Sequence, residues 1–144
     1  MRNLIITMFS LALLAACQGP DTSSAGRGNL LKGIDSASLT TMEWKEKTID
    51  YGKIAEGTKL DLVYRFTNTG EKPLVIDKVE PGCGCTVAET PKAPIAPGKE
   101  GVIRGSFDSN GRPGSQHKTI YVYTNAKGPS PQELIFTVEV VKKG

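Results

Sequence analysis

Two cysteines, Cys83 and Cys85, lie one residue apart in the segment PGCGCT and are the clearest candidates for chemistry in this chain. In an extended strand, residues i and i+2 point to the same face, so the two sulfur atoms would lie side by side. Their Cα atoms would then be about 6.5 Å apart, near the upper edge of disulfide geometry. Gly84 between them could bend the backbone enough to close a small, strained ring that is easily reduced. The spacing permits a disulfide and leaves its role open.

Four interpretations fit this cysteine pair. As a structural pair, free or disulfide-bonded, they would be small apolar residues at the edge of the core, because Val87 continues an apolar pattern towards a sheet. As a redox centre they would be unusual. Redox pairs usually have Cys-x-x-Cys spacing and lie at a helix N-terminus that lowers the thiol pKa, and this segment has neither feature. As a soft-metal site, two thiolates suit Cu(I) better than zinc, which takes four ligands. Oxidative damage or an intermolecular bond is the fourth. We favour the structural role.

No catalytic set accompanies the cysteines. His117 is the only histidine, and it lies between a flexible turn and a strand, where an exposed polar role is expected. A Cys–His nucleophile pair needs an activated thiol and a third group that orients the histidine, and the sequence indicates neither. The run from Asp108 to Gly111 has the oxygen atoms of a calcium loop but lacks the later glutamate, so it predicts a turn. We therefore expect no enzyme activity and no cofactor, with Cu(I) as the alternative.

The segments around these residues alternate between apolar and polar positions, which is the pattern of half-buried β-strands. The clearest example is the segment 59–68, in which Leu60, Leu62, Tyr64 and Phe66 share one face. Turns rich in proline and glycine separate the strands, including a long one at 108–116, and Ile95 between two prolines is expected to plug the core. The same period predicts further strands at 74–79, 102–107, 118–124 and 133–141, and an earlier strand pair around 42–44 and 49–51.

Many short strands with regular turns and no helical period predict an all-β fold. We expect an immunoglobulin-like β-sandwich of seven or eight antiparallel strands, with a small barrel as the alternative. The hallmarks of antibody domains are absent: Trp44 comes too early to be their core tryptophan, and no cysteine pair has their inter-sheet spacing.

The N-terminus predicts export and a lipid anchor. Arg2 precedes an apolar run, Leu4 to Leu14, that is too short to cross a bilayer as a helix. The run ends in Leu-Ala-Ala-Cys, which resembles the lipobox of bacterial lipoproteins and implies cleavage before Cys17 and acylation of that residue. An ordinary signal peptide cut near Ala16, or a fortuitous buried helix, is the alternative. We expect a lipoprotein signal peptide at 1–16, the lipidated cysteine with a flexible tether at 17–38, and the immunoglobulin-like domain at 39–144.

Composition limits the class of partner. The chain has 18 basic and 15 acidic residues, interspersed, with a formal net charge of +3. This balance gives no electrostatic case for binding nucleic acid. We expect a protein held in a membrane by its lipid anchor in the envelope of a Gram-negative bacterium, on the periplasmic face or the outer-membrane surface. A protein partner in the cell envelope is expected, and the sequence does not identify it.

Four motifs carry a resemblance to a known family. They are F-x-N-x-G at 66–70, C-G-C-T at 83–86, I-x-P-G at 95–98 and F-D-S-x-G-x-x-G-x-x-x-K-x-I at 107–120. In these motifs the segment from about 49 to 140 resembles domain of unknown function 1573, which is common in exported bacterial proteins and related in style to Hydin-type modules. The resemblance implies an immunoglobulin-like sandwich, often on a lipoprotein, and no assigned activity. We predict a non-catalytic binding or assembly module on a lipid anchor. The alternative is Cu(I) handling or thiol redox chemistry at Cys83 and Cys85.

Overall fold

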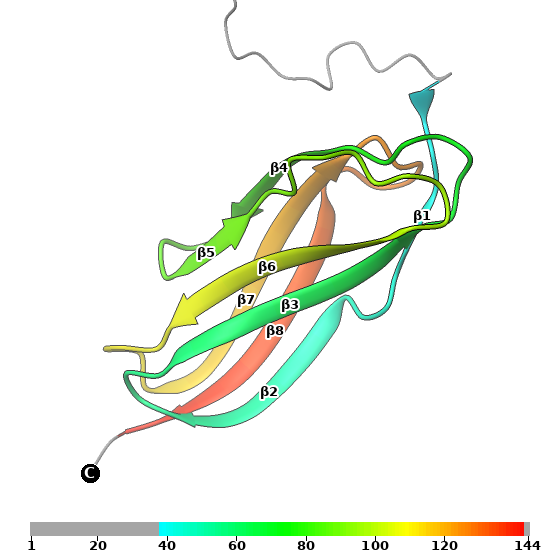
Figure 1. Cartoon of the computed structure of the whole chain (residues 1–144). Helices are drawn as coiled ribbons and strands as arrows, with labels where there is room; N and C mark the ends of the chain where they lie inside the picture. Colours follow the sequence, from blue (N-terminus) through cyan, green and yellow to red (C-terminus); the bar gives the residue numbers. More distant parts are fainter. Residues whose placement is uncertain (1–37, 143–144) are drawn as a thin grey trace, which may run out of the picture.

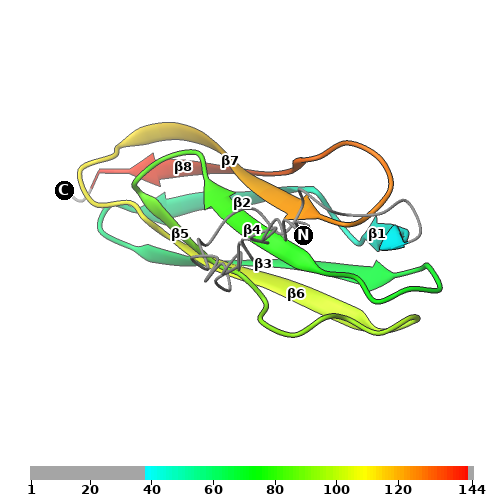
Figure 2. The same cartoon turned by 90° about the horizontal axis from the view of Figure 1, so that it is seen from above.

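A computed structural model describes residues 38–142 of the chain as two four-stranded sheets packed face to face (Figure 1). Viewed from above, β3 and β6 lie in one layer and β7 and β8 in the other (Figure 2). The predicted immunoglobulin-like sandwich is confirmed. The strands are β1 (Met42–Trp44), β2 (Thr48–Ala55), β3 (Lys59–Asn68), β4 (Ile76–Pro81), β5 (Thr86–Glu89), β6 (Glu100–Asp108), β7 (Gly114–Thr124) and β8 (Gln132–Val141).

The strand order is β1-β3-β6-β5 in one sheet and β2-β8-β7-β4 in the other. This order corresponds to that of a constant-type immunoglobulin domain, in which one sheet contains strands A, B, E and D and the other contains strands C, F and G. β1 and β2 together take the place of strand A, with one part in each sheet.

The first two strands differ from the prediction. β1 pairs antiparallel with β3, whereas β2 pairs parallel with β8, so the expectation of antiparallel strands throughout is wrong at this edge. The two segments also do not pair with each other. The connection Lys45-Glu46-Lys47 contains no residue that favours a tight hairpin turn, and it carries the chain from one sheet to the other.

The core forms from the alternating positions that the sequence indicates. In β3, Leu62, Tyr64 and Phe66 are buried, and in β7 Ile120 and Val122 are buried. The same holds for Leu134, Phe136, Val138 and Val140 of β8. Each fully buried side chain of this size contributes about 1.5–3 kcal/mol to stability. The alternation therefore fixes which face of each strand meets the opposite sheet.

Several strand boundaries differ from the prediction, and two of the differences have a clear cause. The strand expected at 74–79 begins at Ile76, because Leu74 instead pairs with Ile95 through two backbone hydrogen bonds of 2.8 Å. Ile95 is buried, as predicted for a core plug. The turn expected at 108–116 is shorter, because β7 already begins at Gly114, whose φ of 94° favours glycine.

Candidate functional site

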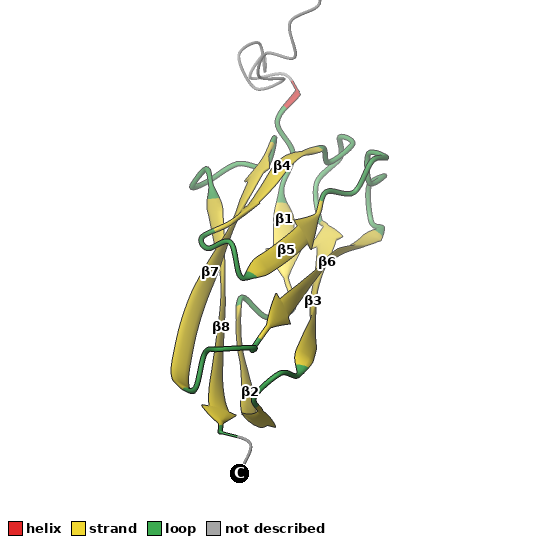
Figure 3. Cartoon of the chain, turned by 90° about the vertical axis from the view of Figure 1, so that its left-hand side faces the viewer, coloured by secondary structure: helices red, strands yellow, loops and turns green. Residues whose placement is uncertain are grey.

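Cys83 and Cys85 lie in the turn between β4 and β5, which belong to opposite sheets (Figure 3). Their sulfur atoms are joined in a disulfide, and their Cα atoms are 5.3 Å apart. The strand geometry expected for this pair is wrong, because the chain turns at Gly84 and Cys85 to cross between the sheets. Both cysteines are half-buried. Val87 is 63% exposed, so the expected apolar pattern towards the sheet does not hold.

Backbone hydrogen bonds fix this turn at both ends. The Gly82 N–H donates to the Thr119 carbonyl of β7 at 2.8 Å, and the Asp108 N–H of β6 donates to the Cys85 carbonyl at 3.0 Å. Within the turn, the Thr86 N–H donates to the Cys83 carbonyl at 3.3 Å. The positions of the two cysteines are therefore set by neighbouring strands as well as by their own bond.

Thr86 is the polar side chain in contact with the disulfide. Its side chain is buried, and its hydroxyl oxygen lies 3.5 Å from the Cys83 sulfur and 3.9 Å from the Cys85 sulfur. The hydroxyl is within hydrogen-bonding distance of the first and at the limit of the second. Cys85 also packs against the hydrophobic core. The two sulfur atoms therefore have different surroundings.

An open hollow of about 250 Å³ lies beside Cys85 and Gly84. Its charged lining consists of Lys59, Arg112 and Asp108. Lys59 and Asp108 are opposite one another in the β3–β6 ladder, and the Arg112 guanidinium donates to the Asn110 carbonyl at 2.8 Å. Two cations and one anion leave a net positive charge at this hollow, which favours the approach of an anionic group.

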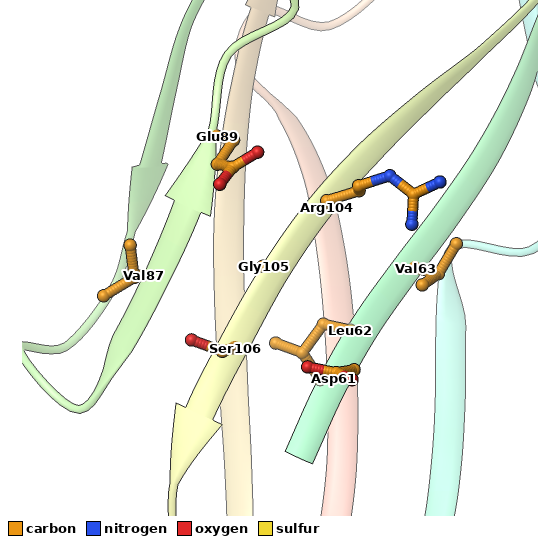
Figure 4. A pocket seen from close by; sticks show the side chains of 8 residues that line it. All are labelled: Asp61, Leu62, Val63, Val87, Glu89, Arg104, Gly105 and Ser106. Carbon is orange, nitrogen blue, oxygen red and sulfur yellow. The ribbon is translucent and has the colours of Figure 1, made fainter. Parts of the chain in front are cut away.

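A second hollow, of about 340 Å³, lies on the outer face of the same sheet and shares Val87 and Ser106 with the first. Glu89 projects from β5 and Asp61 from β3, while the Arg104 side chain extends from β6 towards β3 (Figure 4). Two acidic groups, Asp61 and Glu89, and one basic group, Arg104, line this hollow, so its net charge is negative, opposite in sign to that of the first. The second hollow extends the accessible surface beside the disulfide.

Within the described residues, no hydrogen bond joins His117 to either cysteine. His117 is exposed on β7, opposite Thr137 of β8. The segment from Asp108 to Gly111 forms the predicted turn, in which the Asp108 carboxylate accepts a hydrogen bond from the Asn110 N–H at 3.0 Å. Among residues 38–142, no three His, Cys, Asp or Glu side chains converge as metal ligands.

A groove between β2 and β3, at the edge of the sandwich opposite β4 and β5, was not predicted from the sequence. This β2–β3 groove has a volume of about 570 Å³ and is lined by Lys45, Glu46, Ile49, Val63, Tyr64 and Arg65. The apolar side chains of Ile49 and Val63 are only half-buried at this groove. The groove arises because β1 leaves its sheet after three residues and uncovers the edge of β3.

Backbone groups of β3 face the β2–β3 groove. The N–H and C=O of a strand residue point to the same side, and the side alternates along the strand. The Lys45 N–H donates to the Arg65 carbonyl at 2.9 Å, which places the groups of Asp61, Val63 and Arg65 on the groove side. Within the described part of the chain, the Val63 carbonyl and the Arg65 N–H have no hydrogen-bond partner, nor do the backbone groups of Asp61. β3 therefore presents an unpaired strand edge.

Two tyrosine hydroxyls form hydrogen bonds next to the β2–β3 groove. The Tyr64 hydroxyl donates to the Ile135 carbonyl of the opposite sheet at 2.8 Å. Burial, and secondarily the neighbouring Tyr51, raises the pKa of Tyr64 above its usual value. The Tyr51 hydroxyl accepts a hydrogen bond of 3.4 Å from the Val63 N–H, in the place that a neighbouring strand would occupy.

The F-x-N-x-G motif has a structural role. Asn68 is fully buried, and its amide nitrogen donates to the Lys72 and Ile95 carbonyls, both at 2.8 Å. Its amide oxygen accepts from the Thr40 hydroxyl at 3.0 Å and from the Gly70 N–H at 3.1 Å. One side chain thus joins three separate segments at one end of the sandwich.

Ser109, in the last of the four motifs, has a similar role at the other end. It is fully buried, and its hydroxyl donates to the Thr58 carbonyl at 2.8 Å, next to the turn between β2 and β3. Three of the four motifs therefore have structural roles: Asn68 and Ser109 hydrogen-bond to loops, and Ile95 is buried in the core. The C-G-C-T motif is the one that places reactive groups near the surface.

Residues 42–140 match the family described as protein of unknown function, DUF1573. The chain belongs to the DUF1573 family. This confirms the resemblance drawn from the four motifs. Among curated proteins, no sequence matches the chain.

Solved structures share the fold of this DUF1573 domain. A protein of unknown function from Porphyromonas gingivalis W83 aligns with a TM-score of 0.63 and 18% identity, over 76% of this chain and 51% of its own. The chain thus spans about half the length of that protein. The PapD-like domain 7 of human CEP192 aligns with a TM-score of 0.54 and 11% identity, over 84% of this chain and 99% of its own. The Vibrio cholerae VesB protease aligns over 72% of this chain and 32% of its own, with a TM-score of 0.55 and 11% identity. At these identities the likeness shows the fold alone.

The predicted lipidation site of this DUF1573 protein, Cys17, lies outside the described residues, as do the predicted signal peptide and most of the tether. Within residues 38–142, no helix is long and apolar enough to cross a membrane.

Proposed function

We propose that this chain is a lipid-anchored protein of the bacterial cell envelope whose DUF1573 domain binds a partner protein through the β2–β3 groove and catalyses no reaction. The observation that carries the proposal is the unpaired edge of β3. A row of free backbone groups beside half-buried apolar side chains is the surface to which an extended peptide adds as a further strand.

The occupant that fits the β2–β3 groove is an extended segment of a partner protein. Its backbone would pair with Asp61, Val63 and Arg65 of β3, and displace the Tyr51 hydroxyl from the Val63 N–H. Side chains on alternate positions would point into the groove, where Ile49 and Val63 offer apolar contacts. Lys45 and Arg65 outnumber Glu46 at the groove, which favours a segment with acidic residues.

The non-catalytic part of the proposal is supported by the lack of a linked set of candidate groups. Within residues 38–142, no hydrogen bond joins His117 to Cys83 or Cys85, and no three potential metal ligands converge. The second candidate function, Cu(I) handling, would need the two bonded sulfur atoms of Cys83 and Cys85 to be reduced first.

Placement in the envelope rests on the sequence. The lipobox-like end of the leader predicts an acylated Cys17, and two or three acyl chains hold a protein in a membrane far more firmly than one. The mass of the mature protein should equal that of residues 17–144 plus the acyl groups. An unmodified Cys17 would contradict the anchored part of the proposal.

Photo-crosslinking in bacterial cells tests the binding part. A photo-reactive residue at Glu46, at the groove, should give one discrete adduct, while the same residue at Lys118 on the other sheet should not. Replacing Ile49→Lys in the Glu46 background should abolish the adduct without unfolding the protein, since Ile49 is only half-buried. Sequencing of the crosslinked peptide should show an extended acidic segment with alternating apolar residues.

Three results would contradict this groove as the partner site. They are an adduct with a second copy of the chain, an adduct with the chain's own N-terminal tether, and equal crosslinking from Glu46 and Lys118.

A further inference from the structure

The Cys83–Cys85 disulfide is not explained by stability. A cross-link stabilises a fold mainly by restricting the unfolded chain, and the restriction grows with the length of the closed loop. This bond spans a sequence separation of two, so the loop is about as short as a disulfide allows. The turn is also held by backbone hydrogen bonds from β6 and β7. The bond therefore adds little that the ladders do not already supply.

We propose that the Cys83–Cys85 disulfide is a thiol–disulfide exchange site for a dithiol of a partner protein. This goes beyond the proposed binding function, because the turn lies on the β4–β5 flank and not at the β2–β3 groove. The same hydrogen bonds that make the disulfide dispensable for folding keep the two sulfur atoms close when it is reduced. Bond breaking and re-formation can then proceed without unfolding the turn.

Access to the bond favours attack at Cys85. Its side chain and Gly84 border the open hollow beside the turn, and a side chain at position 84 would meet no atom within 4 Å. Lys59 and Arg112 line the same hollow and would attract an incoming thiolate, with Asp108 as the single opposing charge. The hollow therefore gives an incoming sulfur an open, electropositive approach to Cys85.

Thr86 favours departure of Cys83. Its hydroxyl lies 3.5 Å from the Cys83 sulfur and can donate a hydrogen bond to the thiolate that forms there. The distance to the Cys85 sulfur is 3.9 Å, at the limit for sulfur. A stabilised leaving thiolate accelerates exchange. Thr86 is thus a positioning residue that makes the two sulfur atoms unequal.

The exchange balances in two steps. A partner thiolate attacks the Cys85 sulfur, the Cys83–Cys85 bond breaks, and Cys83 leaves as a thiolate that then takes up a proton. The second thiolate of the partner attacks its own sulfur in the mixed disulfide, and Cys85 leaves and is protonated. The partner dithiol loses two electrons and two protons and becomes a disulfide, and the protein gains both as a dithiol.

The first experiment uses the full chain in detergent, with glutathione as the thiol probe. After quenching by alkylation, the mass of the peptide that contains both cysteines reports the redox state of this pair alone. Reduction should be reversible and about tenfold faster than the reaction of glutathione with a linear disulfide, because the leaving thiolate is stabilised. A pair that reacts no faster than the linear disulfide would overturn the proposal.

The second experiment tests the unequal roles. With oxidised glutathione, Cys83→Ser, which retains Cys85 beside the open hollow, should form the mixed disulfide about tenfold faster than Cys85→Ser, because access to the hollow outweighs the stabilisation of the Cys83 thiolate by Thr86. Thr86→Val should slow exchange in the wild-type pair by about threefold to tenfold and move its pH–rate profile to higher pH, while Thr86→Ser should restore both. Thr137→Val, a threonine on β8, is the matched control and should change neither.

Three results of these measurements would overturn the assignment. Equal or reversed reactivity of the two single-cysteine variants would remove the roles of Cys83 and Cys85. An unmoved pH–rate profile in Thr86→Val would reduce Thr86 to a packing residue. Tight binding of Cu(I) by the reduced pair, lost in both serine variants and accompanied by slow exchange, would make the site a metal site instead.

Discussion

The two flanks of this sandwich are open for different reasons. On the β2–β3 flank, a short β1 leaves backbone groups of β3 unpaired, and the surface is apolar and half-buried. On the β4–β5 flank, the backbone of the crossing turn is hydrogen-bonded to β6 and β7, and the exposed feature is a covalent bond between two side chains. The first flank offers recognition by backbone pairing, and the second offers sulfur chemistry. One small domain can separate these two properties because they lie at opposite edges of the sandwich, with β1 and β2 at one edge and β4 and β5 at the other.

The largest expected effect comes from Asn68, which ties β1 to the end of the sandwich next to the β2–β3 flank. Asn68→Ala should lower the free energy of unfolding by about 2–4 kcal/mol, because buried carbonyl and N–H groups lose their partners. Hydrogen exchange should rise in β1 and remain low in the turn at Cys83 and Cys85. The exposed Asn110→Ala is the control. A uniform loss of protection on both flanks would show that the flanks are not independent.

Tyr64→Phe should have a smaller effect on the same flank. The change removes the hydrogen bond to the Ile135 carbonyl and should cost about 1 kcal/mol in denaturant unfolding. The raised pKa of Tyr64 in the folded state means that the unfolded state loses the proton first. Stability should therefore fall as the pH rises above about 10, the ordinary tyrosine value.

The control for this pH dependence is the Tyr64→Phe protein itself, which should show a shallower loss of stability over the same range. Identical slopes in the two proteins would mean that Tyr64 is not the group responsible.

Reduction of the disulfide should affect stability much less than Asn68→Ala. The loop-entropy relation gives about 1.5 kcal/mol for a loop of three residues as an upper value, against about 3 kcal/mol for fifteen. Denaturation midpoints of the oxidised and reduced protein should therefore differ little. Cys83→Ser with Cys85→Ser should also lower stability by about 1 kcal/mol or less, because both side chains are half-buried and their replacements reach water. A large drop in the denaturation midpoint on reduction would show that the disulfide has a structural, stabilising role.

The smallest effect is expected at Val87, beside the disulfide. Val87→Ser should change the free energy of unfolding by less than about 0.5 kcal/mol, because the side chain is already 63% exposed. Val122→Ala in the core is the reference and should cost about 2 kcal/mol. If Val87→Ser lowered the free energy of unfolding as much as Val122→Ala does, the Val87 side chain would be buried in solution and the β4–β5 flank would not be exposed.

The period of two in the sequence was sufficient to find the core, because a strand with one buried face needs an apolar residue at every second position. The residues from Leu62 to Phe66 and from Leu134 to Val140 are buried as that rule requires. The period does not state which strand is the neighbour or in which direction it runs. For that reason the parallel pairing of β2 with β8 was missed, and with it the β2–β3 groove.

The cysteine pair shows the same limit at the scale of one turn. Its composition and spacing permitted a disulfide, but the local pattern suggested a continuing strand with Val87 facing a sheet. The chain instead crosses between sheets, because Gly82 and Cys85 are held by strands distant in the sequence.

By itself the sequence determined the class of fold, the buried face of each main strand and the membership in the DUF1573 family. These depend on alternation and local motifs, which are properties of neighbouring residues. Tertiary structure alone decided the open edge of β3 and the surroundings of the two sulfur atoms. Those features depend on strands that meet only after folding, such as β1 with β3 and β6 with the turn at Cys85, and no local pattern encodes where such strands end.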